Sequence, residues 1–260
     1  LEDGGEPVYL KSIGDKIDLP PKDVFPFIFS YGNPELRKKW RKLIYQKNPS
    51  LKPEISLPLV TGGLTHGLSI LGYLFIEEGD EILITDKFWG NYKLIFENGF
   101  GAKLKTFNTF KEGKFDLADF QEQIKGKKVV LLNFPNNPSG YTLTEKEVEE
   151  VTNIIKKESE EHSLLVICDD AYFGLVYEEG VYKESLFSQL ANLHENVLAV
   201  KIDGATKEDY VWGLRVGFIT YCCKGMKDFL ALENKTAGAI RGNVSNCSNL
   251  SQSLVLHGLG

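Results

Sequence analysis

The segment VLAVKIDGATK, from Val197 to Lys207, is the stretch that best indicates the fold, because it joins an apolar run to a terminal lysine. A short apolar run bounded by polar residues and glycine is typical of a buried strand. Similar runs recur along the chain. The expected strands are Leu57–Thr61, Glu81–Thr85, Lys103–Phe107, Lys128–Phe134, Leu164–Asp169, Val197–Asp203 and Arg215–Tyr221.

Helix-like segments alternate with these strands. They are Pro34–Gln46, Thr65–Glu77, Asn91–Asn98, Leu117–Ile124, Glu145–Glu161 and Lys224–Thr236. Thr144 is the expected N-cap of the longest segment, with Glu147 completing a capping box. The alternation predicts a mainly parallel sheet covered by helices on both faces, with ligands beyond the carboxyl ends of the strands. Residues 1–30 are rich in proline and glycine and are expected to form an irregular N-terminal arm.

Composition excludes several classes of function. The chain has 260 residues and a net charge of −6, which argues against nucleic acid or an anionic membrane as the main partner. Its four cysteines form no spaced framework, so free thiols in a reducing, cytoplasmic compartment are expected. The four histidines are scattered, and no metal site is expected. No apolar run is long enough to span a membrane, and no signal peptide is visible.

The first candidate site is an anion site in VTGGLTHG (Val60 to Gly67). The chain passes there from strand to helix through Gly62 and Gly63. Backbone N–H groups at a helix N-terminus bind anions, and Thr65 adds a hydroxyl. A glycine-rich turn of this kind is more often only a turn, so this segment alone has low specificity.

The second candidate site involves Lys207 and Arg215, which lie eight residues apart in the sequence. A lysine amine can form an imine with an aldehyde, and an arginine can hold a phosphate with a planar fork of donors. Nearby cationic groups and burial should lower the pKa of the Lys207 amine. A solitary lysine is most often a solvated charge, so this interpretation depends on the motifs around it.

Three further motifs accompany these residues: DKFWGNY (Asp86 to Tyr92), NFPNNPSG (Asn133 to Gly140) and CDDAYFG (Cys168 to Gly174). Asp169 and Asp170 should face opposite sides of a strand, so only one of them can reach a ligand. Together the five motifs, in this order, resemble the class I/II aminotransferases, which are fold-type-I enzymes that use pyridoxal 5′-phosphate. The resemblance covers roughly Tyr31 to the end of the chain.

The resemblance implies an α/β fold: a three-layer α/β/α, mainly parallel but mixed seven-stranded sheet, the large domain of the pyridoxal-phosphate-dependent transferase fold. Residues 31–260 would be this cofactor-binding domain. It implies an aldimine on Lys207, a proton on the ring nitrogen held by Asp169, and Trp89 stacked on the ring. Asn137 and Tyr172 would hydrogen-bond the phenolic oxygen. The phosphate would be held by Gly63, Leu64, Thr65 and Arg215.

Two residues are implied to act across a homodimer. Tyr31, in FSYGNPELRKKW (Phe29 to Trp40), corresponds to a tyrosine that reaches the partner's phosphate. Arg241, in IRGNVSNCS (Ile240 to Ser248), is expected in a loop near the partner's substrate, where dicarboxylate-using members bind the distal carboxylate. An ordinary surface arginine is an equally good interpretation of Arg241.

The chain departs from the family pattern in two places. Gly204 stands where a serine commonly contributes a phosphate contact, and Thr206 is a candidate to replace that hydroxyl. The chain ends before the smaller C-terminal domain that supplies an arginine for the substrate α-carboxylate, so a cofactor-binding domain of a longer enzyme is expected. The predicted function is transfer of an amino group between an amino acid and a 2-oxo acid. The alternatives are a β-lyase, a decarboxylase, or a non-catalytic domain that senses the cofactor.

Overall fold

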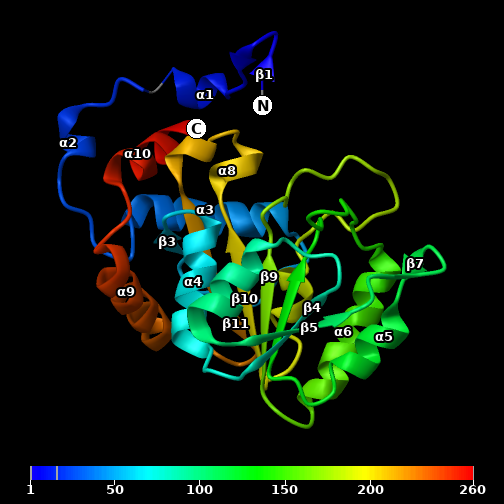
Figure 1. Ribbon diagram of the computed structural model, residues 1–260. Helices are drawn as coiled ribbons and strands as arrows, with labels where there is room; N and C mark the ends of the chain where they lie inside the picture. The colour runs from blue at the N-terminus through cyan, green and yellow to red at the C-terminus, as the bar shows by residue number, and fades with distance from the viewer. Residues whose placement is uncertain (1, 16, 260) are drawn as a thin grey trace.

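A seven-stranded mixed sheet forms the centre of the computed structural model, which describes residues 2–15 and 17–259 (Figure 1). Its strands, in spatial order, are β3 (Leu59–Thr61), β11 (Gly217–Cys223), β10 (Val197–Asp203), β9 (Leu164–Asp169), β8 (Val129–Asn133), β4 (Glu81–Thr85) and β5 (Lys103–Phe107). β11 runs opposite to the other six strands of this sheet. The predicted seven strands and the mainly parallel sheet are therefore confirmed.

The sequence explains which strands are central. Every residue of β8 and β9 is buried, as expected for apolar strands with helices on both faces. The edge strand β5, in contrast, exposes Lys103 and Lys105 and buries Phe107. In parallel strands the carboxyl ends lie at one edge of the sheet. Asn133 pairs in register with Asp169, and Ile202 pairs with Asp169 from the other side, so the carboxyl ends of three strands meet at one place.

The helices that cover the sheet follow the predicted segments closely in most cases. They are α3 (Pro34–Lys47), α4 (Leu64–Phe75), α5 (Leu117–Gln123), α6 (Glu145–Ser159), α9 (Leu230–Val244), the π-helical η1 (Lys93–Asn98), and the short α7 (Phe187–Leu190) and α8 (Ala205–Glu208). The capping box of α6 is present as predicted, because Thr144 accepts from the Glu147 N–H and Glu147 accepts from the Thr144 N–H. α4 packs against β10 and β11.

The C-terminal part of the chain differs from the prediction. The helix expected over Lys224–Thr236 instead begins at Leu230, because Gly225 has a φ of +78° and turns the chain after β11. A further helix, α10 (Asn249–Gly258), was not predicted, although Ser248 caps it by accepting from the Ser251 N–H. Arg241 lies in the last turn of α9, so the expected loop around it is wrong.

The first thirty residues are less irregular than predicted. They contain the two-residue strands β1 (Glu2–Asp3) and β2 (Glu6–Pro7) and the one-turn helices α1 (Lys11–Gly14) and α2 (Pro21–Val24). Both short helices contact α10. A hairpin of β6 (Phe110–Lys111) and β7 (Lys114–Phe115) and the 3₁₀ turn η2 (Trp212–Leu214) complete the elements. Within the part of the chain that the structure describes, no helix is long and apolar enough to cross a membrane.

Candidate active site

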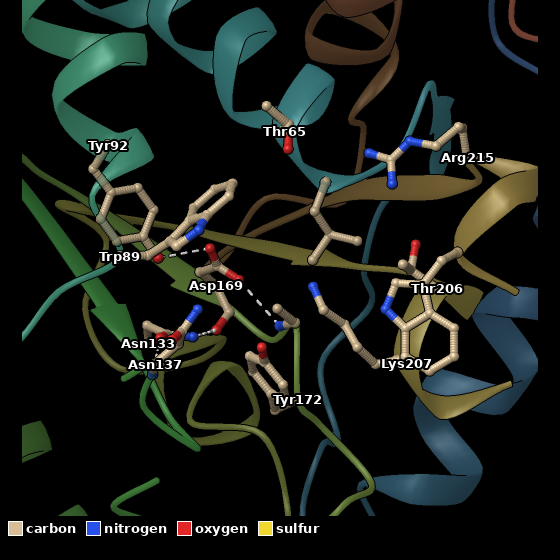
Figure 2. A pocket seen from close by; sticks show the side chains of 13 residues that line it. Thr65, Trp89, Tyr92, Asn133, Asn137, Asp169, Tyr172, Thr206, Lys207 and Arg215 are labelled. Atoms are coloured by element: carbon tan, nitrogen blue, oxygen red, sulfur yellow. Dashed lines mark hydrogen bonds between the residues drawn. The ribbon is translucent and has the colours of Figure 1, made fainter. Parts of the chain in front are cut away.

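A cavity of about 270 Å³ opens at the carboxyl ends of the central strands. Figure 2 shows side chains from well-separated segments turned toward it. Thirteen residues line it: Leu64, Thr65, Trp89, Tyr92, Asn133, Asn137, Asp169, Ala171, Tyr172, Thr206, Lys207, Trp212 and Arg215. The structure thus brings together eight of the predicted site residues, namely Leu64, Thr65, Trp89, Asn137, Asp169, Tyr172, Lys207 and Arg215.

Asp169, the last residue of β9, is the buried acid of the cavity and is only 3% exposed. Its carboxylate accepts from the Tyr92 hydroxyl at 2.7 Å and from the Ala171 N–H at 3.0 Å, as Figure 2 shows. Burial raises the pKa of Asp169, while these hydrogen bonds and the charge of Lys207 act in the opposite direction. Asp170 lines no part of this cavity and instead contacts Lys201 and Ser185, so the two neighbouring carboxylates do face different environments.

Lys207 supplies the amine of the cavity from the one-turn helix α8. Its Nζ lies 5.0 Å from the centre of the Tyr172 ring. Burial lowers the pKa of Lys207; the carboxylate of Asp169 opposes this shift, and the guanidinium of Arg215 adds to it. The expected direction of the shift is therefore confirmed. A lowered pKa increases the share of free amine at neutral pH, which suits a nucleophile or a general base.

The opposite end of the cavity is built to receive an anion. α4 begins at Leu64, and its N-cap Gly63 has a φ of +85°. A Cβ at Gly63 would lie 2.4 Å from Arg215 Nη2, so glycine is required for the guanidinium to lie against the backbone there. Thr65 lines the same end. Free N–H groups of a first helical turn together with an arginine form a site for phosphate.

Gly204 and Thr206 explain how this end differs from the family pattern. A Cβ at Gly204 would lie 2.6 Å from the Val216 carbonyl oxygen and 2.9 Å from Gly217 Cα. A Cβ at Gly217 would in turn lie 2.7 Å from the Gly63 carbonyl carbon. A serine therefore does not fit at position 204. The Thr206 hydroxyl is buried at the cavity and has no hydrogen-bond partner among the described residues.

Three predicted site residues, Gly63, Tyr31 and Arg241, are not among the residues that line the cavity, although Gly63 lies against Arg215. The Tyr31 hydroxyl donates to Asn234 Oδ1 at 2.6 Å, and its ring lies 5.3 Å from the Arg37 guanidinium. Arg241 is exposed on α9. Within the described part of the chain, no group of three or more His, Cys, Asp or Glu residues is placed to hold a metal ion.

Four lining residues were not predicted from the sequence: Tyr92, Asn133, Ala171 and Trp212. Tyr92 ends the DKFWGNY motif, and its ring also meets Trp89 edge-on at 5.6 Å. Asn133 begins NFPNNPSG, and its amide donates to the Asp169 carbonyl oxygen at 2.8 Å. The position of Asn133 at the end of a buried strand was a usable signal. The sequence around Trp212 gave no comparable signal, since an aromatic residue a few positions after Lys207 is compatible with many environments.

Comparison with known proteins identifies the family of this site. The family model "Aminotransferase class I and II" matches residues 22–260. The chain belongs to the class I and II aminotransferases. The aspartate aminotransferase of Sulfolobus acidocaldarius is 26% identical over 227 residues, which is 84% of this chain and 51% of that protein. That of Bacillus sp. strain YM-2 is 27% identical over 164 residues, 62% of this chain and 40% of that protein.

Solved structures agree with this family. The crystal structure of an aminotransferase from Anaerococcus prevotii has a TM-score of 0.86 and 25% identity, covering 98% of this chain and 64% of that one. An Escherichia coli aminotransferase has the same fold, with a TM-score of 0.81 and 15% identity over 97% of this chain and 60% of that one. The chain spans about half the length of the curated aminotransferases that it matches.

The residues of the cavity fit pyridoxal 5′-phosphate, the cofactor of the class I and II aminotransferases. One end of the cavity presents a buried carboxylate beside an indole ring, which suits a protonated aromatic nitrogen. The other end presents the Gly63 cradle, the Arg215 guanidinium and the partnerless Thr206 hydroxyl, which suit a phosphate. The Lys207 amine lies in the same cavity.

Proposed function

We propose that this aminotransferase-family protein moves an amino group between an amino acid and a 2-oxo acid. The observation that supports this most is a single cavity that holds a buried carboxylate, an amine of lowered pKa and an arginine beside a helix N-terminus. Pyridoxal phosphate, when bound, supplies the carbonyl and the electron sink for this chemistry. The protein's own residues then bind and orient the cofactor and move protons.

The proposed roles follow from the positions of the side chains. Lys207 would hold the cofactor covalently and afterwards serve as the general base, because its amine has a lowered pKa. Asp169 would keep a proton on the ring nitrogen, and Tyr92 would orient that carboxylate. Trp89 would stack on the ring. Asn137 and Tyr172 would hydrogen-bond the phenolic oxygen.

The phosphate would be held by the backbone N–H groups around Gly63 and Leu64 and by the side chains of Thr65 and Arg215. We add Thr206 to this set, because its buried hydroxyl has no partner among the described residues and lines the same cavity. Thr206 would then supply the hydroxyl that Gly204 lacks.

We further propose a homodimer in which Tyr31 reaches the phosphate and Arg241 the substrate of the partner subunit. Both lie outside the cavity of their own chain, and Arg241 is exposed on α9, which supports a role for them at another chain's site. Tyr31 would exchange its hydrogen bond to Asn234 for one to the partner's phosphate. Residues 1–30 would form the N-terminal arm and residues 31–260 the cofactor-binding domain. A reducing, cytoplasmic compartment is supported by four cysteines that form no disulfide within the described residues.

Incubation of the cofactor-loaded protein with a panel of ¹⁵N-labelled amino acids and one 2-oxo acid tests the proposed reaction. Transamination moves the label into a new amino acid and converts the donor into its 2-oxo acid. Release of CO₂ or of a β-substituent instead would favour a decarboxylase or a β-lyase. Cofactor binding without turnover of any donor would favour a sensor. Borohydride reduction followed by peptide mapping should place the cofactor on Lys207 alone.

A further inference from the structure

A second charged cluster lies close to the cavity but outside it. It consists of Lys201 and Asp203 on β10 and of Asp170, which follows β9. Their side chains are 0%, 7% and 3% exposed, respectively. Lys201 Nζ forms an ion pair with Asp170 and lies 3.4 Å from Asp203 Oδ2. None of the three lines the cavity.

The cluster is anchored on all sides. The Ser185 hydroxyl donates to Asp170 Oδ2 at 2.6 Å, and Trp40 Nε1 donates to Asp203 Oδ1 at 3.1 Å. The Phe173 ring centre lies 4.3 Å from Lys201 Nζ. Burying charged groups is unfavourable even when they are paired, and well-packed apolar side chains often give equal stability. Stability alone is therefore a weak explanation for this arrangement.

The position of the cluster in the chain offers a better explanation. Asp170 directly follows Asp169, and Asp203 precedes Lys207 by four residues. The Asp170 N–H also donates to the Ile202 carbonyl oxygen at 2.8 Å, so the ends of β9 and β10 are joined at this point. Lys201 therefore connects Asp170, the neighbour of Asp169, to Asp203, which lies shortly before Lys207.

We propose that Lys201 is a positioning residue that ties Asp170 to Asp203 and thereby fixes the Asp169 carboxylate relative to the Lys207 amine. The inference rests on the proposed function for the roles of Asp169 and Lys207. Burial raises the pKa of Asp169, and the charge of Lys201 is among the effects that oppose this shift. Burial lowers the pKa of Lys207, and a carboxylate held in place at Asp169 opposes this shift. The reactivity of the Lys207 amine therefore reports whether the ion-pair bridge Asp170–Lys201–Asp203 is intact.

The test measures Lys207 in the cofactor-free protein by competitive acetylation across pH, with exposed Lys183 as the internal reference. The groups that face Lys207 are Asp169, Arg215 and the Tyr172 ring. The variant Lys201→Met/Asp170→Asn removes one positive and one negative charge together, so the net charge stays constant while the bridge is lost. We expect labelling of Lys207 at pH 8 to rise roughly twofold or more. Without the bridge, the Asp169 carboxylate stabilises the ammonium form of Lys207 less, so a larger share of the amine is free to react.

A thermodynamic cycle shows whether the bridge acts through Asp169. In an Asp169→Asn background, the same pair of substitutions should no longer change Lys207 labelling, because the carboxylate that the bridge positions is gone. Ile155→Ala, a core change on α6, is the matched control for lost stability and should leave Lys207 labelling unchanged. An increase that persists without Asp169, or that Ile155→Ala reproduces, overturns the proposal.

Asp203→Asn provides the second variant, should the paired substitution prevent folding. The asparagine oxygen still accepts from Trp40, but the tie to Lys201 is weakened. Asp203→Asn should increase the labelling of Lys207 more in the wild-type background than in the Asp169→Asn background. Equal changes in the two backgrounds, or no change, contradict a positioning role. The labelling experiment needs no cofactor. Cofactor binding is measured separately, by the visible absorption of the cofactor, and its failure would count against the proposed function and not against the positioning role of Lys201.

Discussion

Asp169 and Gly204 show how much single residues decide in this site. Strand alternation alone indicated that only one of Asp169 and Asp170 could reach a ligand, and the structure places Asp169 in the cavity. The need for glycine at position 204 could not be predicted in the same way. It arises from a contact with the Val216 backbone, which lies beside Gly204 only after β11 has paired with β10. Local patterns reveal which way a side chain points, but not what it meets.

Asp169→Asn should leave the protein folded and able to bind the cofactor but should slow proton abstraction from a substrate. The asparagine cannot keep a positive ring nitrogen in a buried site. We expect a loss of roughly 10²–10³-fold in single-turnover rate, the scale of one preorganised electrostatic contact. Tyr92→Phe, which removes only the orienting hydroxyl, should cause a smaller loss. Equal rates for wild type and Asp169→Asn would remove Asp169 from the site.

Gly204→Ser should weaken the protein rather than restore a missing contact. The new Cβ would meet the Val216 carbonyl oxygen and the Gly217 backbone, which cannot yield as a side chain does. Overpacking of this kind costs about 1–3 kcal/mol, so we expect a Tm lower by several degrees. Gly238→Ser, at a position with open space on α9, is the control and should not lower the Tm by as much. Tighter cofactor binding by Gly204→Ser, measured by titration, would show that the contact can be relieved.

The reactive amine lies on a short element, and elements of this kind were the hardest to predict. The seven strands were predicted because buried apolar runs dominate their local sequence. α8, which carries Lys207, is a single turn, and the sequence GATKED has no periodicity that could reveal it. α10 was missed as well, since no helix was expected from the sequence beyond Thr236. The sequence therefore indicated the frame of the site more reliably than the turns that complete it.

Asp209, the C-cap of α8, makes the stability of this turn depend on pH. Burial, and then the neighbouring Glu208, raise the pKa of Asp209 to about 6 from an ordinary value of 3.8. Ionisation of Asp209 therefore destabilises the folded state increasingly as pH rises from about 4 through about 6. Asp209→Asn should raise the Tm at pH 7.5 and change it much less at pH 4. Exposed Asp18→Asn should have little effect at either pH, and a uniform effect of Asp209→Asn would contradict this account.

At the scale of the whole molecule, the topology brings distant segments to one edge of the sheet. The carboxyl ends of β8, β9 and β10 meet there because these strands are parallel and adjacent. The sequence order of motifs indicated this gathering, since each motif follows an expected strand. The proposed roles of Tyr31 and Arg241 across a homodimer rest on the family resemblance, because a contact between subunits depends on the surface of a second chain as well as on this one.

Mixing two inactive variants tests the proposed homodimer. One carries Tyr31→Phe and Arg241→Ala, and the other carries Lys207→Ala. In a mixed dimer with shared sites, one site receives all intact residues and the other none. At equal amounts, activity should recover to roughly a quarter of the wild-type value, since about half of the dimers are mixed and each has one good site. Activity equal to the mean of the separate variants would argue against sharing.

The close contacts among Gly63, Gly204 and Gly217 also constrain how this protein can diverge. Each Cβ introduced alone would collide with a backbone atom or a guanidinium that another segment places there. A lineage could exchange one of these glycines only after a neighbouring segment had already moved. These positions should therefore be inherited as a block. Descendants that carry serine at position 204 should have acquired a wider gap between β10 and β11 beforehand.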